Sequence, residues 1–347
     1  MIVGADSDYA IERAFRKYLS VHPSIVALDF FPAQNLFLEY YRKSLFNKIR
    51  YRIGLSRILA SINLGLLKRV DEFRPDMILF FKGMEIYPGT LKKLSLQGIK
   101  LVNYNPDNPF IFSGRGSGNR NVTRSVSLFD LYLSYDIEVC ERLMKESNVV
   151  SGLLPFGFEI DERYFQSCGV VPEVIRTCFV GNPDKQRCDF INNIAGSGVK
   201  IDVYGNRWEK WPLHENISIK GYLQGLQLWE KLRAYRVQLN LLRSHNEHSH
   251  NMRTFEIPAI GGIQLAPDTP DHRLFFKPSE EIFLFNEITD CVDTINRLLA
   301  LPVSEAEVIR IAARKRSVES GYSYRYRTEE LVSLLEKYIY CKTPNEK

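Results

Sequence analysis

The residues "HSHNMRTFEIPAIGGIQLA", 248 to 266, contain one complete passage from a loop through a helix into a strand. Asn251 is a good N-cap, and Met252–Ala259 after it has the spacing of a short amphipathic helix. Two glycines follow and end that helix, and the apolar run Ile263–Ala266 then has the character of a buried strand. A helix that leads directly into a buried strand is typical of α/β proteins.

The same alternation continues along the whole chain. In the first half we expect strands at Met1–Ala5, Ser24–Phe30, Met77–Phe81, Ile99–Tyr104, Leu128–Ser134 and Ser151–Pro155. In the second half we expect them at Thr177–Val180, Val199–Tyr204, Ile217–Ile219, Val237–Leu242, Ile263–Ala266 and Glu281–Phe285. Parallel neighbours need a helical crossover, so this order predicts an α/β fold of two doubly wound, Rossmann-like domains. Such domains usually face each other across a cleft at the carboxyl ends of their strands.

Helical spacing is found between these strands. The helices are expected at Asp8–Leu19 (capped by Ser7 or Asp6), Pro88–Leu96, Ile137–Lys145, Lys185–Ala195, Leu226–Ala234, Met252–Ala259, Glu287–Leu299, Glu305–Ser320 and Thr328–Tyr338. A length of 347 residues suits two domains. We place them at 1–158 and 172–324, joined by a weakly periodic linker from Glu159 to about Pro172. The last helix, about 325–347, is expected to pack back on the first domain.

The composition is that of a globular protein, with 45% hydrophobic and 25% charged residues. No apolar run approaches the roughly 20 residues that span a bilayer. Acidic residues interrupt the first apolar segment, which argues against a signal peptide. The six cysteines are scattered without a CxxC pair, which favours a reducing compartment, so we expect a cytoplasmic protein.

Positive charge is concentrated between Arg42 and Arg69. The stretch holds no acidic residue and eight basic ones: Arg42, Lys43, Lys48, Arg50, Arg52, Arg57, Lys68 and Arg69. Apolar residues recur among them at roughly helical spacing. A basic amphipathic helix of this kind can lie on an anionic membrane surface or receive acidic groups, and it can equally be a solvated helix face.

Two turns after predicted strands have the same composition. "FVGNPDKQR" places Gly181 and Asn182 at a strand end and Arg187 in the first turn of a helix, and "VYGNRW" places Gly205 after Tyr204. A glycine at such a point lets the backbone approach a ligand, and a helix N-terminus favours anions. The alternative for each is an ordinary turn.

The quoted stretch adds charge to a helix N-terminus. Asn251 would direct the first amide groups of the helix toward a ligand, and Arg253 suits a diphosphate. Glu256 lies one turn further along, where a carboxylate can bind hydroxyl groups such as those of a ribose. This set fits a nucleotide-sugar. The alternative is a surface pair of Arg253 and Glu256 at i,i+3, which contributes only about 0.2–0.5 kcal/mol.

Other motifs are less decisive. The chain has no Walker A loop, and no GxGxxG follows the first strand, so common ATPase and dinucleotide sites lose support. "SGRGSGNRN", residues 113 to 121, is either a phosphate loop or an ordinary loop. His245, His248 and His250 could hold zinc, take part in binding or proton transfer, or be plain loop residues.

Several segments together resemble one family. "NMRTFEIPAIGG" resembles the N-x-R-x-F-E-x-x-A-x-G-G stretch of the CgeB-like glycosyltransferases, a branch of the GT-B superfamily. "RPDMILFFKG", "KLVNYNPDNPF", "FDLYLSYD", "LLPFGFE", "FVGNPDKQR" and "VYGNRW" follow the order of that family's segments. The resemblance covers nearly the whole chain.

The resemblance implies a metal-independent transferase that moves a sugar from a nucleotide-sugar to a hydroxyl acceptor. The acceptor would be a glycan such as a growing polysaccharide, a lipid-linked glycan or a protein, and no nucleic acid is expected as a partner. The second domain would bind the donor through Gly181, Asn182, Arg187, Tyr204, Gly205, His250, Asn251, Arg253, Phe255 and Glu256. Within this set, Glu256 matches the glutamate that holds the ribose. Asp6, Asn108 and Arg115 are expected on the acceptor side.

The catalytic groups are harder to assign. Related retaining enzymes often carry a second glutamate eight residues before the first, where this chain has His248, and Glu247 is one position away. The route, retaining or inverting, therefore stays open. An inverting route needs a base for the acceptor hydroxyl, for which we expect Asp107 first and Asp8 second. A non-catalytic sugar-binding clamp and a sugar-nucleotide epimerase are the alternatives to transfer.

Overall fold

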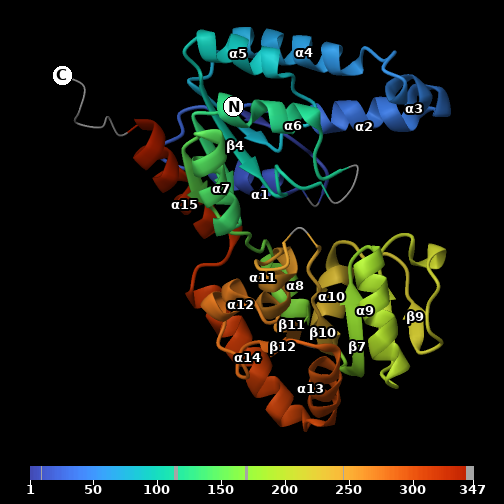
Figure 1. Cartoon of the computed structure of the whole chain (residues 1–347). Helices are drawn as coiled ribbons and strands as arrows, with labels where there is room; N and C mark the ends of the chain where they lie inside the picture. The colour runs from blue at the N-terminus through green and yellow to red at the C-terminus, as the bar shows by residue number, and fades with distance from the viewer. Residues whose placement is uncertain (9, 113–115, 169–170, 245, 341–347) are drawn as a thin grey trace. The chain divides into compact units, whose positions relative to one another are not determined.

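The computed structural model describes residues 1–8, 10–112, 116–168, 171–244 and 246–340 of the chain. The chain divides into two compact units (Figure 1). The first unit comprises Met1–Pro155 and Tyr324–Lys347, and the second comprises Phe156–Ser323. Each unit is built around its own parallel sheet.

The sheet of the first unit has the strand order β2-β1-β3-β4-β5-β6, and every pairing is parallel. Its strands are β1 (Ile2–Val3), β2 (Phe30–Phe31), β3 (Met77–Phe81), β4 (Lys100–Asn105), β5 (Leu131–Ser134) and β6 (Ser151–Leu153). The central strands β3 and β4 are largely buried on both faces, as expected where helices cover both sides of a sheet.

The helices of the first unit cover this sheet. They are α1 (Ile11–Leu19), α2 (Ala33–Lys43), α3 (Leu45–Arg52), α4 (Ile58–Phe73), α5 (Pro88–Leu96), α6 (Arg120–Ser125), α7 (Ile137–Ser147) and α15 (Tyr324–Leu335). The C-terminal helix α15 belongs here because it packs on α1, and the rings of Phe15 and Tyr324 meet edge to face at 5.5 Å.

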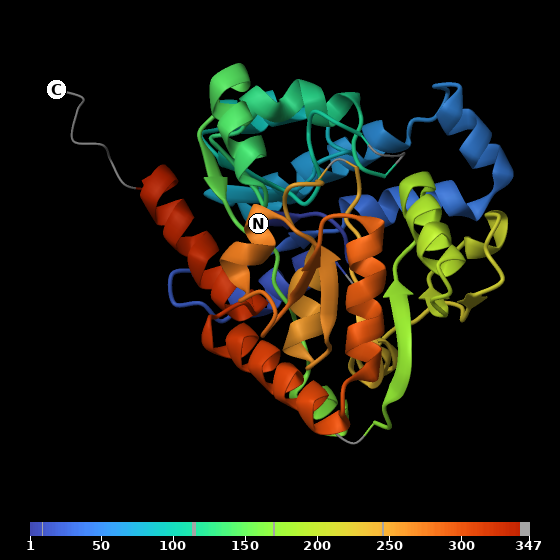
Figure 2. The ribbon, with the colours of Figure 1, turned by 60° about the horizontal axis from the view of Figure 1, so that its bottom comes forward.

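The second unit repeats the architecture with the strand order β12-β11-β10-β7-β8-β9, again parallel throughout. Its strands are β7 (Val174–Val180), which is the long yellow-green arrow of Figure 2, β8 (Ile201–Tyr204), β9 (Ile217–Ile219), β10 (Tyr235–Leu239), β11 (Gln264–Pro267) and β12 (Phe283–Phe285). Its helices are α8 (Glu162–Cys168), α9 (Lys185–Gly196), α10 (Leu226–Ala234), α11 (Met252–Ala259), α12 (Pro270–Phe275), α13 (Ile288–Ala300) and α14 (Val303–Glu319). The prediction of two doubly wound α/β sheets is confirmed.

The two ends of the second unit are joined to each other. The amide of Phe158 donates to the carbonyl of Tyr322 at 3.1 Å, and Phe158 forms an isolated bridge with Ser323. The hydroxyl of Tyr322 donates to the carbonyl of Phe275 at 2.8 Å. The chain therefore enters and leaves this unit at the same place, which lets its last helix belong to the first unit.

Four expectations about local structure are wrong. The predicted strand Ser24–Phe30 is wrong, because only Phe30 of it belongs to a strand, the short β2. The residues before Phe30 form no strand, and the side chain of Val26 is fully exposed to solvent. Residues 159–172 are not a plain linker, because they include α8. Neither Ser7 nor Asp6 caps α1, whose N-cap is Ala10 and has no side-chain bond.

The fourth concerns the basic stretch, which is not one helix. An extended Ser44 separates α2 from α3, and Gly54 at φ 75° lies between α3 and α4. Glycine takes this left-handed conformation without the strain that a side chain would add. The stretch from Arg42 to Arg69 therefore comprises the end of α2, the whole of α3 and most of α4.

Candidate functional site

The two glycine turns of the second unit lie side by side, because neighbouring parallel strands end at the same edge of the sheet. The amide of Asn206 donates to the side-chain oxygen of Asn182 at 2.9 Å, and the indole of Trp208 donates to the carbonyl of Gly181 at 2.9 Å. Gly205 has φ 148°, and a Cβ there would lie 2.2 Å from the Gly181 carbonyl oxygen. Gly205 is thus required by the approach of the two turns to each other.

Arg187 is buried beneath these turns. Its guanidinium donates to the carbonyls of Asn182 at 3.2 Å and Leu241 at 2.8 Å, and so ties the end of β7 to the end of β10. The pKa of Arg187 is lowered to about 10, mainly by burial and in smaller part by the nearby charges of Arg243 and Arg253, which Asp184 opposes. Arg187, which we expected to bind the donor, thus holds two strand ends together.

Arg243 is a member of this positive group that the sequence interpretation overlooked. It is exposed and follows β10 in the chain. Three arginines therefore lie near one another at the carboxyl edge of the sheet, since Arg243 and Arg253 both act on the pKa of Arg187. The buried Nε atoms of Arg187 and Arg253 have no hydrogen-bond partner among the described residues. The signal in the sequence was an arginine just after a buried strand.

The N-terminus of α11 is fixed by a capping box, which confirms Asn251 as its N-cap. The Asn251 side chain accepts from the amide of Thr254 at 3.1 Å, and the Thr254 hydroxyl oxygen accepts from the amide of Asn251 at 3.2 Å. Asn251 also donates to the side chain of Asn240 at 2.8 Å. Within the described part of the chain, the amides of Met252 and Arg253 have no acceptor. These two amides remain available to an anion.

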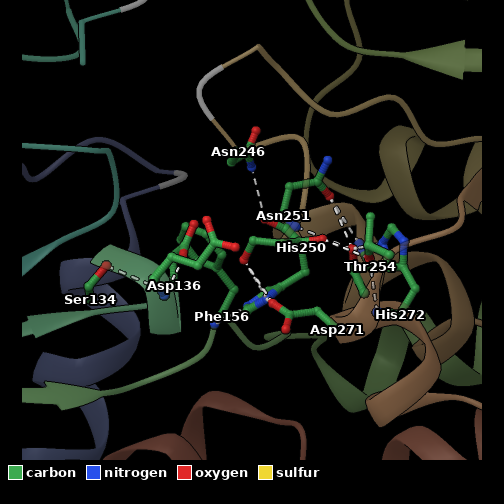
Figure 3. Close-up of polar contacts among 12 residues, drawn as sticks. Ser134, Asp136, Phe156, Asn246, His250, Asn251, Thr254, Asp271 and His272 are labelled. Carbon is green, nitrogen blue, oxygen red and sulfur yellow. Dashed lines mark hydrogen bonds and ion pairs between the residues drawn. The ribbon is translucent and has the colours of Figure 1, made fainter. Parts of the chain in front are cut away.

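A buried histidine supports the cap. His272 is fully buried, its Nδ1 lies 2.8 Å from the carbonyl of Pro267, and its Nε2 lies 3.0 Å from the Thr254 hydroxyl (Figure 3). Burial lowers its pKa to about 4, so the ring is neutral near pH 7. Because a carbonyl only accepts, Nδ1 must carry the proton and Nε2 must accept from Thr254.

Arg253 and Glu256 contact each other directly, one helical turn apart. Their side chains are 25% and 9% exposed, so the i,i+3 pair forms but is not an ordinary surface pair. Burial lowers the pKa of Arg253 to about 10. The contact uses Oε2 of Glu256, and Oε1 has no hydrogen-bond partner among the residues described. That oxygen can accept from a hydroxyl group.

Three residues that we expected to bind the donor are buried, and their side chains contact other residues inside the second unit. His250 is buried, its Nδ1 lies 2.6 Å from the carboxylate of Asp271, and its Nε2 accepts from the amide of Phe156 at 3.3 Å (Figure 3). Phe255 is fully buried and packs on the rings of His250, Phe275, Phe276 and Tyr322. The hydroxyl of Tyr204 bonds to that of Tyr235, which in turn donates to Asp202.

The other polar residues of the loop before α11 do not form one cluster. His248 is exposed, and Glu247 accepts from Gln186 at 2.9 Å. Asn246 is buried and donates to the carbonyl of His250 at 3.0 Å. His245 lies outside the described residues. Among those described, no group of three or more His, Cys, Asp or Glu side chains is arranged to hold a metal ion.

In the first unit, Asp107 forms an ion pair with Lys82 at the carboxyl end of the sheet. Two buried glutamates lie near the same lysine, and neither was predicted. Glu12 accepts from the amide of Ala5 at 2.8 Å, and a Cβ at Gly4 would lie 2.7 Å from its Oε1. Burial raises the pKa of Glu12 and of Glu85, and the charge of Lys82 opposes both shifts.

The other residues predicted for a site in the first unit make other contacts or lie outside the described residues. Asp8, the second choice for a base, is exposed and forms an ion pair with Arg13. Asn108 is a turn residue whose side chain accepts from the amides of Phe110 and Ile111. Asp6 pairs with Arg16 at 3.2 Å. Arg115 and most of the glycine-rich start of "SGRGSGNRN" lie outside the described residues.

Part of the sequence and the fold of the chain are similar to known proteins. Residues 185–333 match the family described as glycosyl transferase-like. The fold of the whole chain, two parallel six-stranded α/β units, is that of the GT-B glycosyltransferases. Residues 185–333 are therefore a glycosyl transferase-like domain, which begins at α9, and the whole chain has the GT-B fold. No curated protein matches the sequence.

Solved structures share this fold at low identity. Sucrose-phosphate synthase from Thermosynechococcus elongatus is 11% identical with a TM-score of 0.62, over 82% of this chain and 79% of that one. HepE of Anabaena, in complex with UDP, is 12% identical with a TM-score of 0.59, over 97% and 99%. A putative UDP-N-acetylglucosamine 2-epimerase from Listeria monocytogenes is 10% identical with a TM-score of 0.53, over 100% and 98%.

Proposed function

We propose that this chain transfers a sugar from a nucleotide-sugar to an acceptor hydroxyl and that its second unit binds the donor. The observation that carries this proposal is the N-terminus of α11. The amides of Met252 and Arg253 there have no acceptor among the described residues and lie beside the Arg253 side chain. Amide dipoles and a guanidinium at one point suit the diphosphate of a nucleotide.

The same groups would act on the reaction. As the bond between the anomeric carbon and the diphosphate oxygen breaks, negative charge builds on the leaving nucleoside diphosphate. The α11 amides, Arg253 and the exposed Arg243 would stabilise that charge. Glu256 would keep Arg253 in place through Oε2 and accept a ribose hydroxyl through Oε1.

The first unit would supply the acceptor side. For an inverting route, Asp107 with its partner Lys82 is the proposed proton acceptor. Glu12 is a second one, because it is a buried carboxyl near Lys82 and burial raises its pKa, as suits a general base. The motif "NMRTFEIPAIGG" supports placement of the chain with the CgeB-like branch, with a glycan, lipid-linked glycan or protein as acceptor.

The donor proposal is tested with nucleotides alone. UDP is the first choice, because HepE was solved with UDP, and GDP, CMP and dTDP complete the panel. At about 100 times its dissociation constant the correct nucleotide should stabilise the folded chain by about 2.7 kcal/mol in a thermal shift. Release of that nucleotide from its sugar donor would then establish transfer or hydrolysis. A chain that no nucleotide stabilises would contradict the proposal.

One alternative has a specific observation in its favour, which is the fold shared with a putative epimerase. Incubation of the chain with each nucleotide-sugar alone separates the two activities. An epimerase converts the donor into another sugar nucleotide, whereas a transferase leaves the sugar unchanged until it is moved. A clamp without chemistry would bind the nucleotide-sugar and release nothing.

A further inference from the structure

The helix α3 carries an apolar surface that the other described residues of the chain leave uncovered. None of its residues is buried. The exposed fractions of Leu45, Phe46, Ile49 and Ile53 are 74%, 64%, 55% and 61%, and Leu55 in the following turn is 64% exposed. An apolar group of this size on a soluble surface is usually an interaction site.

These side chains share one face of the helix. Successive residues of an α-helix differ by about 100°, which places Leu45, Ile49, Ile53 and Phe46 within an arc of about 100°. The opposite face holds Asn47 and Tyr51. Tyr51 packs edge to face on Phe37 and Tyr41 of α2, at 4.8 and 5.8 Å. Contact with α2 therefore turns the apolar face outward.

Positive charge borders this face on both sides. On the same helical projection Arg52 and Lys48 lie along one edge of the apolar arc, and Arg50 lies along the other. Within the described part of the chain, none of the basic residues between positions 42 and 57 forms an ion pair: Arg42, Lys43, Lys48, Arg50, Arg52 and Arg57. An apolar stripe between two rows of cations is typical of helices that lie in the interface of an anionic membrane.

Position and length agree with surface attachment. Figures 1 and 2 show α3 at one end of the first unit, away from its sheet. Among the described residues no helix is long and apolar enough to cross a membrane. We propose that α3 and the turn 53–57, here called the α3 anchor, insert their apolar side chains into the interface of an anionic lipid bilayer. This inference does not depend on transferase activity.

The test measures binding of the whole chain to sedimented vesicles. Vesicles of mixed phosphatidylglycerol and phosphatidylcholine should bind the chain at low salt, and vesicles of phosphatidylcholine alone should bind it far less. Raising the salt to about 0.5 M should weaken binding, because the Debye length falls to a few ångströms. Equal binding to both vesicles, or to neither, would overturn the proposal.

Variants then separate the apolar and the charged contributions. Leu45→Ser, Phe46→Ser and Ile49→Ser together should lower the partition coefficient about a hundredfold, or about fivefold each. The matched control, Val303→Ser, Val308→Ser and Ile311→Ser on α14, alters side chains of similar exposure, 65%, 66% and 60%, and should have no effect. A loss of binding in the control, or none in the first variant, would refute the α3 anchor.

The charged contribution is tested in the same way. Arg50→Gln with Arg52→Gln should lower binding about 25-fold, since each cation near an anionic surface contributes about fivefold. Lys92→Gln with Lys93→Gln on α5 removes two exposed cations elsewhere in the first unit and is the control. Sedimentation velocity completes the test. A dimer that the α3 variant dissociates, together with no vesicle binding, would assign this face to a second copy of the chain.

Discussion

The contact between Arg253 and Glu256 allows the donor proposal to be tested quantitatively. Glu256→Gln keeps the size of the side chain and removes its charge. The side chain is 9% exposed and its Oε1 has no described partner, so a ribose hydroxyl would meet it with little competition from water. A hydrogen bond to a charged acceptor contributes about 1.5–3 kcal/mol, so kcat/KM for the donor should fall about 10- to 150-fold. The change should appear mainly in KM, because the ribose does not react.

The assay is release of nucleoside diphosphate, with inhibition by UDP, 2′-deoxy-UDP and 3′-deoxy-UDP. The natural chain should prefer UDP to at least one deoxy analogue, and Glu256→Gln should lose most of that preference. A general loss of structure would not remove the preference selectively. An unchanged KM and an unchanged preference in Glu256→Gln would refute the ribose role.

The same pair should also couple in stability. Arg253→Met leaves the Glu256 carboxylate nearly buried without its partner, which should lower the free energy of unfolding by about 1–3 kcal/mol. Adding Glu256→Gln should recover part of that loss, so the two changes are not additive. The control pair is Lys277 and Glu280, also at i,i+3, with side chains 57% and 58% exposed. Its coupling should be below about 1 kcal/mol. Equal coupling in both pairs would contradict the structure.

Three further predictions concern the two units separately. His272 has its pKa lowered to about 4, so the unfolded chain takes up a proton at higher pH than the folded chain. Stability contributed by the neutral ring is therefore complete above about pH 6.5 and falls by up to about 3 kcal/mol as the pH drops toward 4. Urea unfolding at several pH values should show this loss, and His272→Gln should reduce it. Gly205→Ala should lower the free energy of unfolding by more than about 2 kcal/mol, because the new Cβ would lie 2.2 Å from the Gly181 carbonyl oxygen. The control is Gly196→Ala, whose Cβ would meet nothing within 4 Å and which should not destabilise the chain. Lys82→Met should abolish transfer to an acceptor, while nucleotide binding measured by thermal shift should persist. Lys92→Met, at an exposed lysine, is the control. Retained transfer in Lys82→Met would exclude a role for the pair of Lys82 and Asp107.

Much of the secondary structure could be predicted because the residues that begin and end each helix or strand lie next to it in the sequence. Met77–Phe81 and Leu226–Ala234 were expected at the residues where the structure has them, and so was Pro88–Leu96, which begins with a proline. Met252–Ala259 begins at an asparagine cap and is followed by two glycines. Where such signals were absent, as before Phe30, the expectation was wrong.

The sequence by itself determined the class of fold and the residues at the start of α11, because strand periodicity, caps and turns depend on neighbours along the chain. Only the tertiary structure decided which side chains remain available. Arg187 bonds to a carbonyl 54 residues away, His250 to an amide 94 residues away, and Lys82 acts on the buried Glu12 of another element. No local pattern encodes such partners. They exist only because folding brings distant segments together, where burial favours the pairing of most polar groups.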